Sequence, residues 1–251
     1  MDRERAQAFM KKVVDDVGTA VSAALVLVGD RVGLFKAMAG AAPQTADALA
    51  ARVGIHPRYV EEWLSAMVCA GYLDHDATHD TFVLPDEHAM YLIDPTAETY
   101  LGGLFGGLPG LLGMTPQLVE AFQRGHGIPF ATFGEGLPVA LEQMNRPVYE
   151  KRLVGTWLPN LPAVVERLQQ GGRAIDIGCG TGVVPITLAK AFPGARIEGL
   201  DLDARSIGIA RRYAEEAGVA DRIVFRQAAA AELTGEPGYD LITTFDVIHD
   251  L

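Results

Sequence analysis

A glycine-rich turn at residues 178–182 has the residue types and spacing that best fit ligand binding. Gly178, Gly180 and Gly182 follow directly after the short apolar segment 173–177. That segment predicts a strand, and the residues after Gly182 predict a helix. Glycines in such a turn permit a sharp bend and let a ligand approach bare backbone, and the helix N-terminus offers unpaired N–H groups. We therefore expect a binding site for a nucleotide-like ligand here.

Two acidic residues accompany the turn. Asp176 precedes it on the first strand, and Asp201 ends the second predicted strand, 23 residues beyond Gly178. A carboxylate in that place suits hydrogen bonds from ribose hydroxyls. The dinucleotide fingerprint also requires glycine at the sixth position of the turn, where this sequence has Val183. The NAD pattern therefore fails, and the tighter Gly-x-Gly-x-Gly pattern remains.

The elements that would position these residues alternate along the last part of the chain. Strands are predicted at 173–178, 196–200, 222–227 and 239–245, and helices at 183–192 and 203–217. Asp203 is suited to cap the second helix, and Gly218 to end it. Short connections between alternating strands and helices are typical of a doubly wound, mostly parallel sheet. We predict an α/β, Rossmann-like domain over residues 161–251.

Residues 1–95 predict a mainly helical domain. Apolar residues recur at helical spacing from Phe9 to Val28, and the part from Ala20 onward is apolar on most faces. That part suits a helix buried on several sides, either in the domain core or in a homodimer interface. The sequence leaves these two interpretations open.

A helix-turn-helix pattern follows the long helix. Thr45 is suited to cap one helix and Gly54 to end it, and Pro57 fits the first turn of the next. Two short apolar segments, 72–73 and 81–84, then flank an acidic turn, like the wing of a winged helix. We expect this module to serve packing or dimerisation.

Charge argues against nucleic acid as a partner. The chain has 21 basic and 32 acidic residues, and residues 45–95 contain two arginines, no lysine and nine Asp or Glu. A DNA-binding helix needs a basic outer face. The histidines of the acidic turn, His75 and His79, form no ordered ligand set for a metal, so we expect a solvated hairpin there.

Cysteine content and the N-terminus bear on the compartment. The two cysteines, Cys69 and Cys179, are too few for a disulfide framework, which favours a reducing cytoplasm. The charged start of the chain lacks the apolar region of a secretory signal.

Residues 96–160 are the hardest to interpret. Residues 99–119 carry no charge but contain six glycines and two prolines, which disfavour a membrane-spanning helix and suggest a buried apolar connector. Residues 124–136 predict a loop, and 141–157 predict a helix. This region either covers a ligand pocket or merely connects two domains.

Two segments carry a family resemblance. AIDIGCGTG (174–182) and GLDLD (199–203) resemble the first two motifs of class I S-adenosylmethionine-dependent methyltransferases. The winged-helix region, HGIPFATFG, NRPVYEKRL and FDVIHDL extend the resemblance over nearly the whole chain, to bacterial members with an N-terminal winged-helix dimerisation domain. The resemblance implies that the turn 178–182 lies against the methionine part of the cofactor S-adenosylmethionine, that Asp201 binds both ribose hydroxyls and that Asp176 orders the turn. The cofactor contacts implied in this way are Asp176, Gly178, Cys179, Gly180, Gly182, Asp201, Leu202, Phe245 and Asp246.

Two features depart from the family pattern. Ala229 stands where an aspartate commonly accepts from the adenine amino group, so a backbone contact or Glu232 is left for that role. The sequence also reaches only the fourth of the family's seven strands. We therefore expect either a C-terminally incomplete sequence or a domain that another chain completes.

The segment FDVIHDL bears on mechanism. In related O-methyltransferases a His-Asp pair after the fourth strand supplies a general base, and His249 with Asp250 matches that place. A neutral imidazole suits removal of a proton from a hydroxyl near neutral pH. The other interpretation is a histidine with a purely structural hydrogen bond.

Together these observations predict a methyltransferase that acts on a small-molecule acceptor and forms a homodimer through its N-terminal helices. The predicted organisation is a winged-helix domain over 1–95, a connector or substrate lid over 96–160 and a cofactor-binding domain over 161–251. The alternative function is a winged-helix transcriptional regulator or a non-catalytic protein that binds S-adenosylmethionine.

Overall fold

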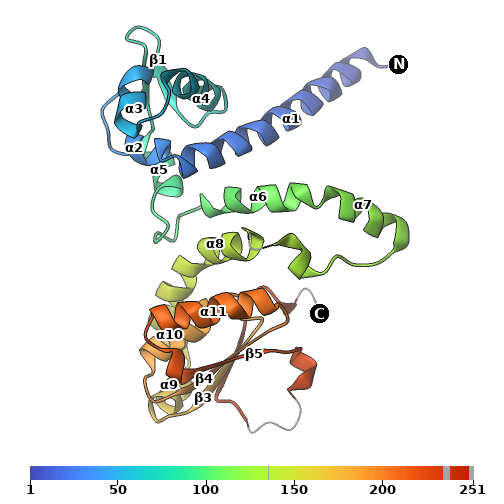
Figure 1. Ribbon diagram of the computed structural model, residues 1–251, viewed down its shortest axis with the longest axis vertical. Coiled ribbons are helices and arrows are strands. Elements are labelled where there is room, and N and C mark those ends of the chain that lie inside the picture. Colours follow the sequence, from blue (N-terminus) through green and yellow to red (C-terminus); the bar gives the residue numbers. More distant parts are fainter. Residues whose placement is uncertain (135, 234–237, 249–251) are drawn as a thin grey trace. The chain divides into compact units, whose positions relative to one another are not determined.

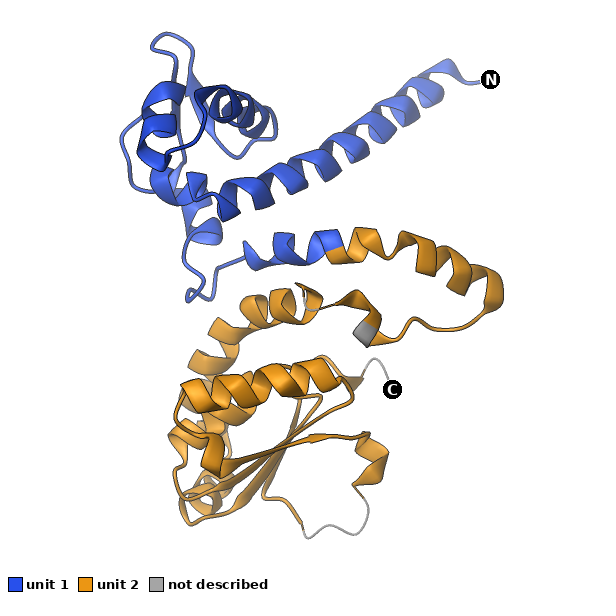
Figure 2. Ribbon diagram, in the orientation of Figure 1, with its two compact units in different colours: residues 1–109 blue, residues 110–251 orange. Residues whose placement is uncertain are grey.

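The structure is a computed structural model that describes residues 1–134, 136–233 and 238–248. The chain divides into two compact units, residues 1–109 and 110–251, which Figure 2 shows in separate colours. Figure 1 labels the main helices and strands. Each unit has its own hydrophobic core, as separate domains do.

The first unit begins with the long helix α1 (Arg3–Arg31), as its periodicity predicts. Asp2 caps α1, because its carboxylate accepts a hydrogen bond from the backbone N–H of Arg5 at 3.1 Å. The expectation that residues 20–28 are buried on several sides is wrong within this chain: Val21 and Val28 are 57% and 48% exposed. The core of the unit covers α1 only near its C-terminal end, at Val26 and Gly29.

The helix-turn-helix prediction is confirmed. The helices are α2 (Leu34–Met38), α3 (Ala46–Val53) and α4 (Pro57–Cys69). Thr45 caps α3 through its side chain, and Gly54 ends α3 in the left-handed conformation. The apolar stripe of α4 is buried at Val60, Trp63, Leu64 and Met67. The indole N–H of Trp63 also donates to the carbonyl of Leu25 at 2.9 Å, which ties α4 to α1.

The predicted wing is an antiparallel hairpin of β1 (Asp74–Asp76) and β2 (Thr81–Val83). Its first strand starts two residues later than predicted, and Leu73, just before it, is 3% exposed and packs in the core of the unit. The histidines of the turn pair locally, His75 with Asp80 and His79 with Asp76. The helix α5 (Asp86–Leu92) follows the hairpin.

The uncharged segment 99–119 is largely helical, and several of its apolar side chains are exposed, whereas a buried connector was expected. It contains α6 (Gly103–Gly113), with Pro109 in its interior, and the start of α7 (Thr115–Arg124). Helices satisfy the backbone hydrogen bonds locally, so the side chains need not be covered. The exposed apolar residues include Leu104, Leu111, Leu112, Leu118 and Val119. No helix in the described part of the chain has the length and low charge needed to cross a bilayer.

Short helical elements lead to the sheet of the second unit. They are η1 (Phe130–Phe133), α8 (Gly136–Arg152), the π-helical turn η2 (Leu153–Trp157), η3 (Leu158–Asn160) and α9 (Pro162–Gln169). The helix predicted over 141–157 is thus present but starts earlier and ends in a π-helical turn.

The four-stranded sheet confirms the α/β prediction. Its strands are β3 (Arg173–Ile177), β4 (Arg196–Asp201), β5 (Ile223–Gln227) and β6 (Leu241–Thr244). The helices between them are α10 (Val183–Ala191) and α11 (Ala204–Glu216), and the turns η4 (Ala220–Arg222) and η5 (Ala230–Glu232) flank β5. The strand order is β5-β4-β3-β6 with all neighbours parallel. Because β3 lies between β4 and β6, the direction of the connections reverses beside it, and a crevice forms there outside the carboxyl ends.

Candidate functional site

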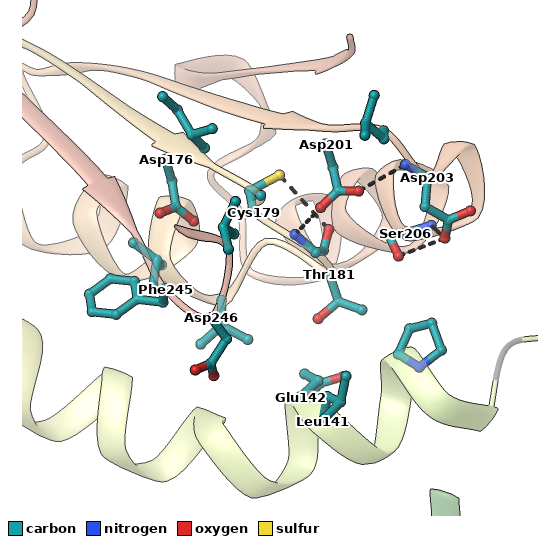
Figure 3. Close-up of a pocket in the computed structure, with 18 of the residues that line it drawn as sticks. Leu141, Glu142, Asp176, Cys179, Thr181, Asp201, Asp203, Ser206, Phe245 and Asp246 are labelled. Atoms are coloured by element: carbon teal, nitrogen blue, oxygen red, sulfur yellow. Dashed lines mark hydrogen bonds between the residues drawn. The ribbon is translucent and has the colours of Figure 1, made fainter. Parts of the chain in front are cut away.

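A cavity of about 800 Å³ lies at this crevice, within the second unit. Its size is in the range of pockets that hold small molecules. The ends of β3, β4 and β6 form one wall, and residues on α8 and in the segment 128–133 form the other. Figure 3 shows labelled side chains from the two walls.

The structure brings most of the predicted site residues together. Those that line the cavity are Asp176, Gly178, Cys179, Gly180, Asp201, Leu202, Phe245 and Asp246. Gly182 is not part of the lining and instead precedes α10 as its N-cap. His249, the predicted base, lies outside the described residues.

The three glycines of the turn all have left-handed backbone conformations, and each has a different surrounding. A Cβ at Gly178 would overlap the side chain of Val247, and one at Gly182 would lie 2.9 Å from Ala210. A Cβ at Gly180 would meet no atom within 4 Å, so the backbone there faces open space. Only Gly180 thus leaves room against bare backbone for a ligand.

Asp201 holds the turn from the end of β4. One carboxylate oxygen accepts from the backbone N–H of Gly180 at 2.8 Å, and the other accepts from that of Asp203 at 2.8 Å. Each carboxylate oxygen has a second lone pair, so Asp201 retains acceptor capacity toward the cavity. The next residue, Leu202, is 72% exposed and supplies an apolar surface beside it.

Asp176 is buried on β3, with 3% of its surface exposed. Its carboxylate accepts a hydrogen bond from the hydroxyl of Thr243 on β6 at 2.7 Å. Burial, helped by the charge of Asp201 and opposed by the Thr243 hydrogen bond, raises the pKa of Asp176 to about 7. This hydrogen bond links the strands β3 and β6. The backbone of the turn is held instead by hydrogen bonds to the carbonyl of Leu200 and the carboxylate of Asp201.

Cys179 is a buried member of the turn. Burial raises the pKa of its thiol, and the charges of Asp176 and Asp201 raise it further. A thiol with a raised pKa carries little thiolate, so Cys179 is poorly suited to act as a nucleophile. Its side chain packs at Gly199, where a Cβ would approach the sulfur to 3.0 Å.

The carboxyl end of β6 is joined to α8. Phe245 packs against the ring of Tyr149, with centroids 4.7 Å apart. Asp246 has a φ of 54°, unusual for a residue with a side chain, and its carboxylate accepts from Asn145 at 3.3 Å and from Tyr149 at 3.5 Å. Burial and the charge of Asp246 raise the pKa of Tyr149. Such strained residues cluster at functional sites.

The sequence left open whether residues 96–160 cover a ligand pocket or only connect two domains, and in the structure residues 128–149 form a wall of the cavity. Its apolar members are Ile128, Phe130, Phe133, Pro138, Leu141 and Met144. The segments HGIPFATFG and NRPVYEKRL overlap this wall and contribute to the family resemblance. Their composition alone does not predict that they line a cavity. The structure shows that this part of the connector lines the cavity.

The cavity has a marked charge imbalance. Five carboxylates line it, from Glu142, Asp176, Asp201, Asp203 and Asp246, and no Lys, Arg or His is present among the described lining residues. Clefts lined by charges of one sign attract ligands of the opposite sign. The hydroxyl of Thr181 is also buried and has no partner among the described residues.

Of the groups considered for adenine recognition, the backbone beyond β5 lies at the cavity, whereas Glu232 is absent from the described lining. The carboxylate of Glu232 accepts from the backbone N–H of Ala229 at 2.7 Å, and Glu232 is absent from the described lining. Ala228 and Ala230 line the cavity, so the chain beyond β5 presents small residues and backbone there.

Family models match both units. Residues 20–93 match the Rv2258c-like winged HTH domain, and residues 174–251 match a methyltransferase domain.

Individual proteins are similar over parts of the chain. A probable cobalt-precorrin-6B C(15)-methyltransferase of Pyrobaculum calidifontis is 32% identical over 118 residues, 47% of this chain and 49% of that protein. A ubiquinone biosynthesis O-methyltransferase of Bordetella avium is 36% identical over 81 residues, 32% of each chain. The matches therefore span about half or less of the length of these curated relatives.

Two solved structures share the fold over most of the chain. A putative O-methyltransferase from Nostoc punctiforme has a TM-score of 0.69 at 19% identity, covering 94% of this chain and 69% of that one. The mitomycin 7-O-methyltransferase has a TM-score of 0.63 at 22% identity, covering 100% and 74%.

Proposed function

The chain joins an Rv2258c-like winged helix-turn-helix domain to a methyltransferase domain, and on this premise we propose that it transfers a methyl group from S-adenosylmethionine to a small-molecule acceptor. The observation that carries the proposal is the hydrogen bond between Gly180 and Asp201. It joins an open glycine backbone to a carboxylate at the crevice of a parallel sheet, where such folds bind nucleotides.

The residues present fit this cofactor. Gly180 leaves space against bare backbone, and Asp201 keeps acceptor capacity for ribose hydroxyls. The acidic lining without Lys, Arg or His among its described residues suits a ligand that carries a sulfonium cation. When bound, the cofactor supplies an electrophilic methyl group on that sulfonium. The protein's part is to bind both reactants, orient them and exclude water from between them.

The acceptor is proposed to occupy the space beside the apolar wall. Phe130, Phe133 and Met144 offer apolar contact, and they line the same cavity as Phe245 and Asp246. Oxygen is the proposed methyl-accepting atom, in keeping with the named O-methyltransferases that share the fold. His249 is proposed as the base that removes the hydroxyl proton, a role that needs hydrogen-bond reach to the acceptor.

Calorimetric titration of S-adenosylhomocysteine into the protein tests the proposal. We expect micromolar binding with one site per chain, and methyl transfer from labelled S-adenosylmethionine to a small molecule with a hydroxyl group. A folded protein that binds neither S-adenosylmethionine nor S-adenosylhomocysteine contradicts the proposal.

Replacing Asp201 tests the cofactor site directly. We expect Asp201→Ala to weaken binding of S-adenosylhomocysteine by roughly 1.5–3 kcal/mol, since a charge-assisted hydrogen bond is lost. Asp201→Asn keeps one acceptor oxygen and should lose less. Asp221→Ala, which removes an 83% exposed carboxylate of the same unit, serves as the control in the same titration. Equal affinities for all of these variants and the wild type would remove Asp201 from the site.

The charge of the winged-helix region disfavours the regulator alternative. Arg58 at the start of α4 is already ion-paired with Glu61 and Glu62, so the helix offers phosphates no free cation there. Salt-dependent binding to duplex DNA would be the observation in favour of a regulator.

The protein is proposed to form a homodimer through α1. Five apolar residues recur along α1 at spacings of three, four or seven: Met10, Val14, Val17, Val21 and Val28. They are between 48% and 64% exposed. Such a stripe matches the seam of a coiled coil, and exposed apolar stripes mark protein interfaces.

Replacing one apolar residue of the seam with a charged residue tests the dimer. We expect Val17→Lys to convert the protein to a monomer, because a charged lysine in the apolar seam would lose water against the partner helix. Thr19→Lys is the matched control, since Thr19 is also exposed and lies on the opposite face of α1. Sedimentation velocity distinguishes the two variants. A dimeric Val17→Lys variant, or a monomeric wild type, would rule out this seam.

A reducing cytoplasm is the proposed compartment. Cys69 is exposed and Cys179 buried, and neither is in a disulfide. Free thiols persist where glutathione and thioredoxin keep them reduced.

A further inference from the structure

A glutamate on α8 has one carboxylate oxygen without a hydrogen-bond partner among the described residues. The Glu142 side chain is 7% exposed, and its Oε1 accepts from Nε of Arg146 at 2.6 Å. Its Oε2 is buried and has no hydrogen-bond partner among the described residues. Glu142 also lines the cavity.

An unpartnered carboxylate oxygen is costly to bury. A charged group that loses water without a hydrogen bond pays a larger desolvation penalty than a neutral one. Arg146 does not serve both oxygens: its Nε donates to Oε1 of Glu142, and its Nη1 donates to Glu150 at 3.0 Å. Oε2 therefore lacks a donor within the described structure, and it belongs to a side chain that lines the cavity.

The position of Glu142 indicates which part of a ligand it meets. In Figure 3 Glu142 and Leu141 extend from α8 on the side of the cavity opposite the glycine turn, where Thr181 is labelled. The helix α8 packs against α10, which begins directly after that turn. Asp201, the proposed ribose acceptor, lies at the end of the neighbouring strand β4. With the ribose at Asp201, as proposed above, we expect the amino-acid end of the cofactor to lie toward the turn and α8.

We propose that Oε2 of Glu142 binds the α-ammonium group at the amino-acid end of S-adenosylmethionine. This proposal rests on the proposed function. The ammonium group supplies three N–H donors and a full positive charge, which match a buried carboxylate oxygen. Arg146 contacts only Oε1 of Glu142, and no Lys, Arg or His is present in the described lining of the cavity. Glu142 is then a binding residue that selects cofactors with an intact amino-acid end.

The test compares two ligands across three proteins. S-adenosylhomocysteine carries the ammonium group, whereas 5′-methylthioadenosine lacks the whole amino-acid end. Glu142→Gln removes the charge at the cavity. Glu150→Gln is the matched control, because Glu150 is bonded to the same arginine but is absent from the described lining.

We expect Glu142→Gln to weaken S-adenosylhomocysteine by about tenfold or more in calorimetric titration. Binding of 5′-methylthioadenosine should stay unchanged in both variants, and Glu150→Gln should bind both ligands like the wild type. Should the glutamine variant be unstable by thermal denaturation, Glu142→Met, which keeps a similar side-chain volume, takes its place in the same comparison.

Two outcomes overturn the inference while the wild type still binds. Unchanged affinity of Glu142→Gln for S-adenosylhomocysteine shows that Oε2 does not contact the ligand. An equal loss for both ligands shows that Glu142 shapes the cavity without recognising the ammonium group. Failure of the proposed function has a different signature, since the wild type then binds neither ligand.

Discussion

We expect Gly178→Ala to lower the free energy of unfolding by roughly 2–5 kcal/mol. Gly178 has a φ of 72°, and a left-handed conformation costs a residue with a side chain roughly 1–2 kcal/mol. The added Cβ would also overlap Val247, and overpacking of that kind costs roughly 1–3 kcal/mol. Urea denaturation followed by circular dichroism measures the loss.

Gly180→Ala is the matched variant in the same turn. Gly180 has a φ of 51°, but a Cβ there meets no atom within 4 Å. Only the backbone strain of roughly 1–2 kcal/mol should appear in its unfolding free energy. Its methyl group enters the open space of the cavity instead, so binding of S-adenosylhomocysteine should weaken. If Gly180→Ala destabilises the fold as much as Gly178→Ala and leaves binding intact, the two glycines do not have these separate roles.

The second large effect concerns pH and Asp176. Its pKa is about 7 in the folded protein and 3.8 in an ordinary environment, so the folded state binds the proton more tightly. The associated stability is fully present below pH 4 and is lost as the pH rises through 7, because the buried carboxylate must then ionise. From the two pKa values the loss approaches about 4 kcal/mol by pH 8.

Asp176→Asn removes this titration. Its amide oxygen still accepts the hydrogen bond from Thr243. We expect the variant to gain stability relative to the wild type between pH 5 and pH 8, measured by urea denaturation at each pH. Parallel pH profiles of the two proteins would show that Asp176 is ionised at little cost in the fold.

The glycine turn and Asp201 were predictable because their information is local. The turn lies between a strand and a helix that can both be predicted from their apolar patterns. A parallel sheet then brings the end of the next strand, with Asp201, beside the turn. Thr45 and Gly54 bound their helix for the same local reasons. Caps and turns are set by a few neighbouring residues, and a single sequence contains these.

A pocket-covering role for residues 96–160 was one of two open alternatives, but the particular residues of the α8 wall were not predictable, because they depend on contacts between distant positions. Asn145 and Asp246 are 101 positions apart, and no pattern in either segment points to the other. In segment 99–119 the helix costs of Gly and Pro disfavour a membrane-spanning helix but do not prevent the shorter helices α6 and α7, because propensity is a weak guide that the rest of the fold overrides. That Oε2 of Glu142 lacks a hydrogen-bond partner among the described residues can be seen only in the structure, where Arg146 bonds to Oε1 of Glu142 and to Glu150.

The placement of the aromatic residues gives each unit an optical reporter of its own. The chain has two tryptophans, Trp63 in the core of the first unit and Trp157 beside Phe245 in the second. Replacing either one with phenylalanine leaves fluorescence from a single unit. The pair of variants then shows whether the two units unfold in one cooperative transition or separately, and Trp157 emission also follows ligands that reach Phe245.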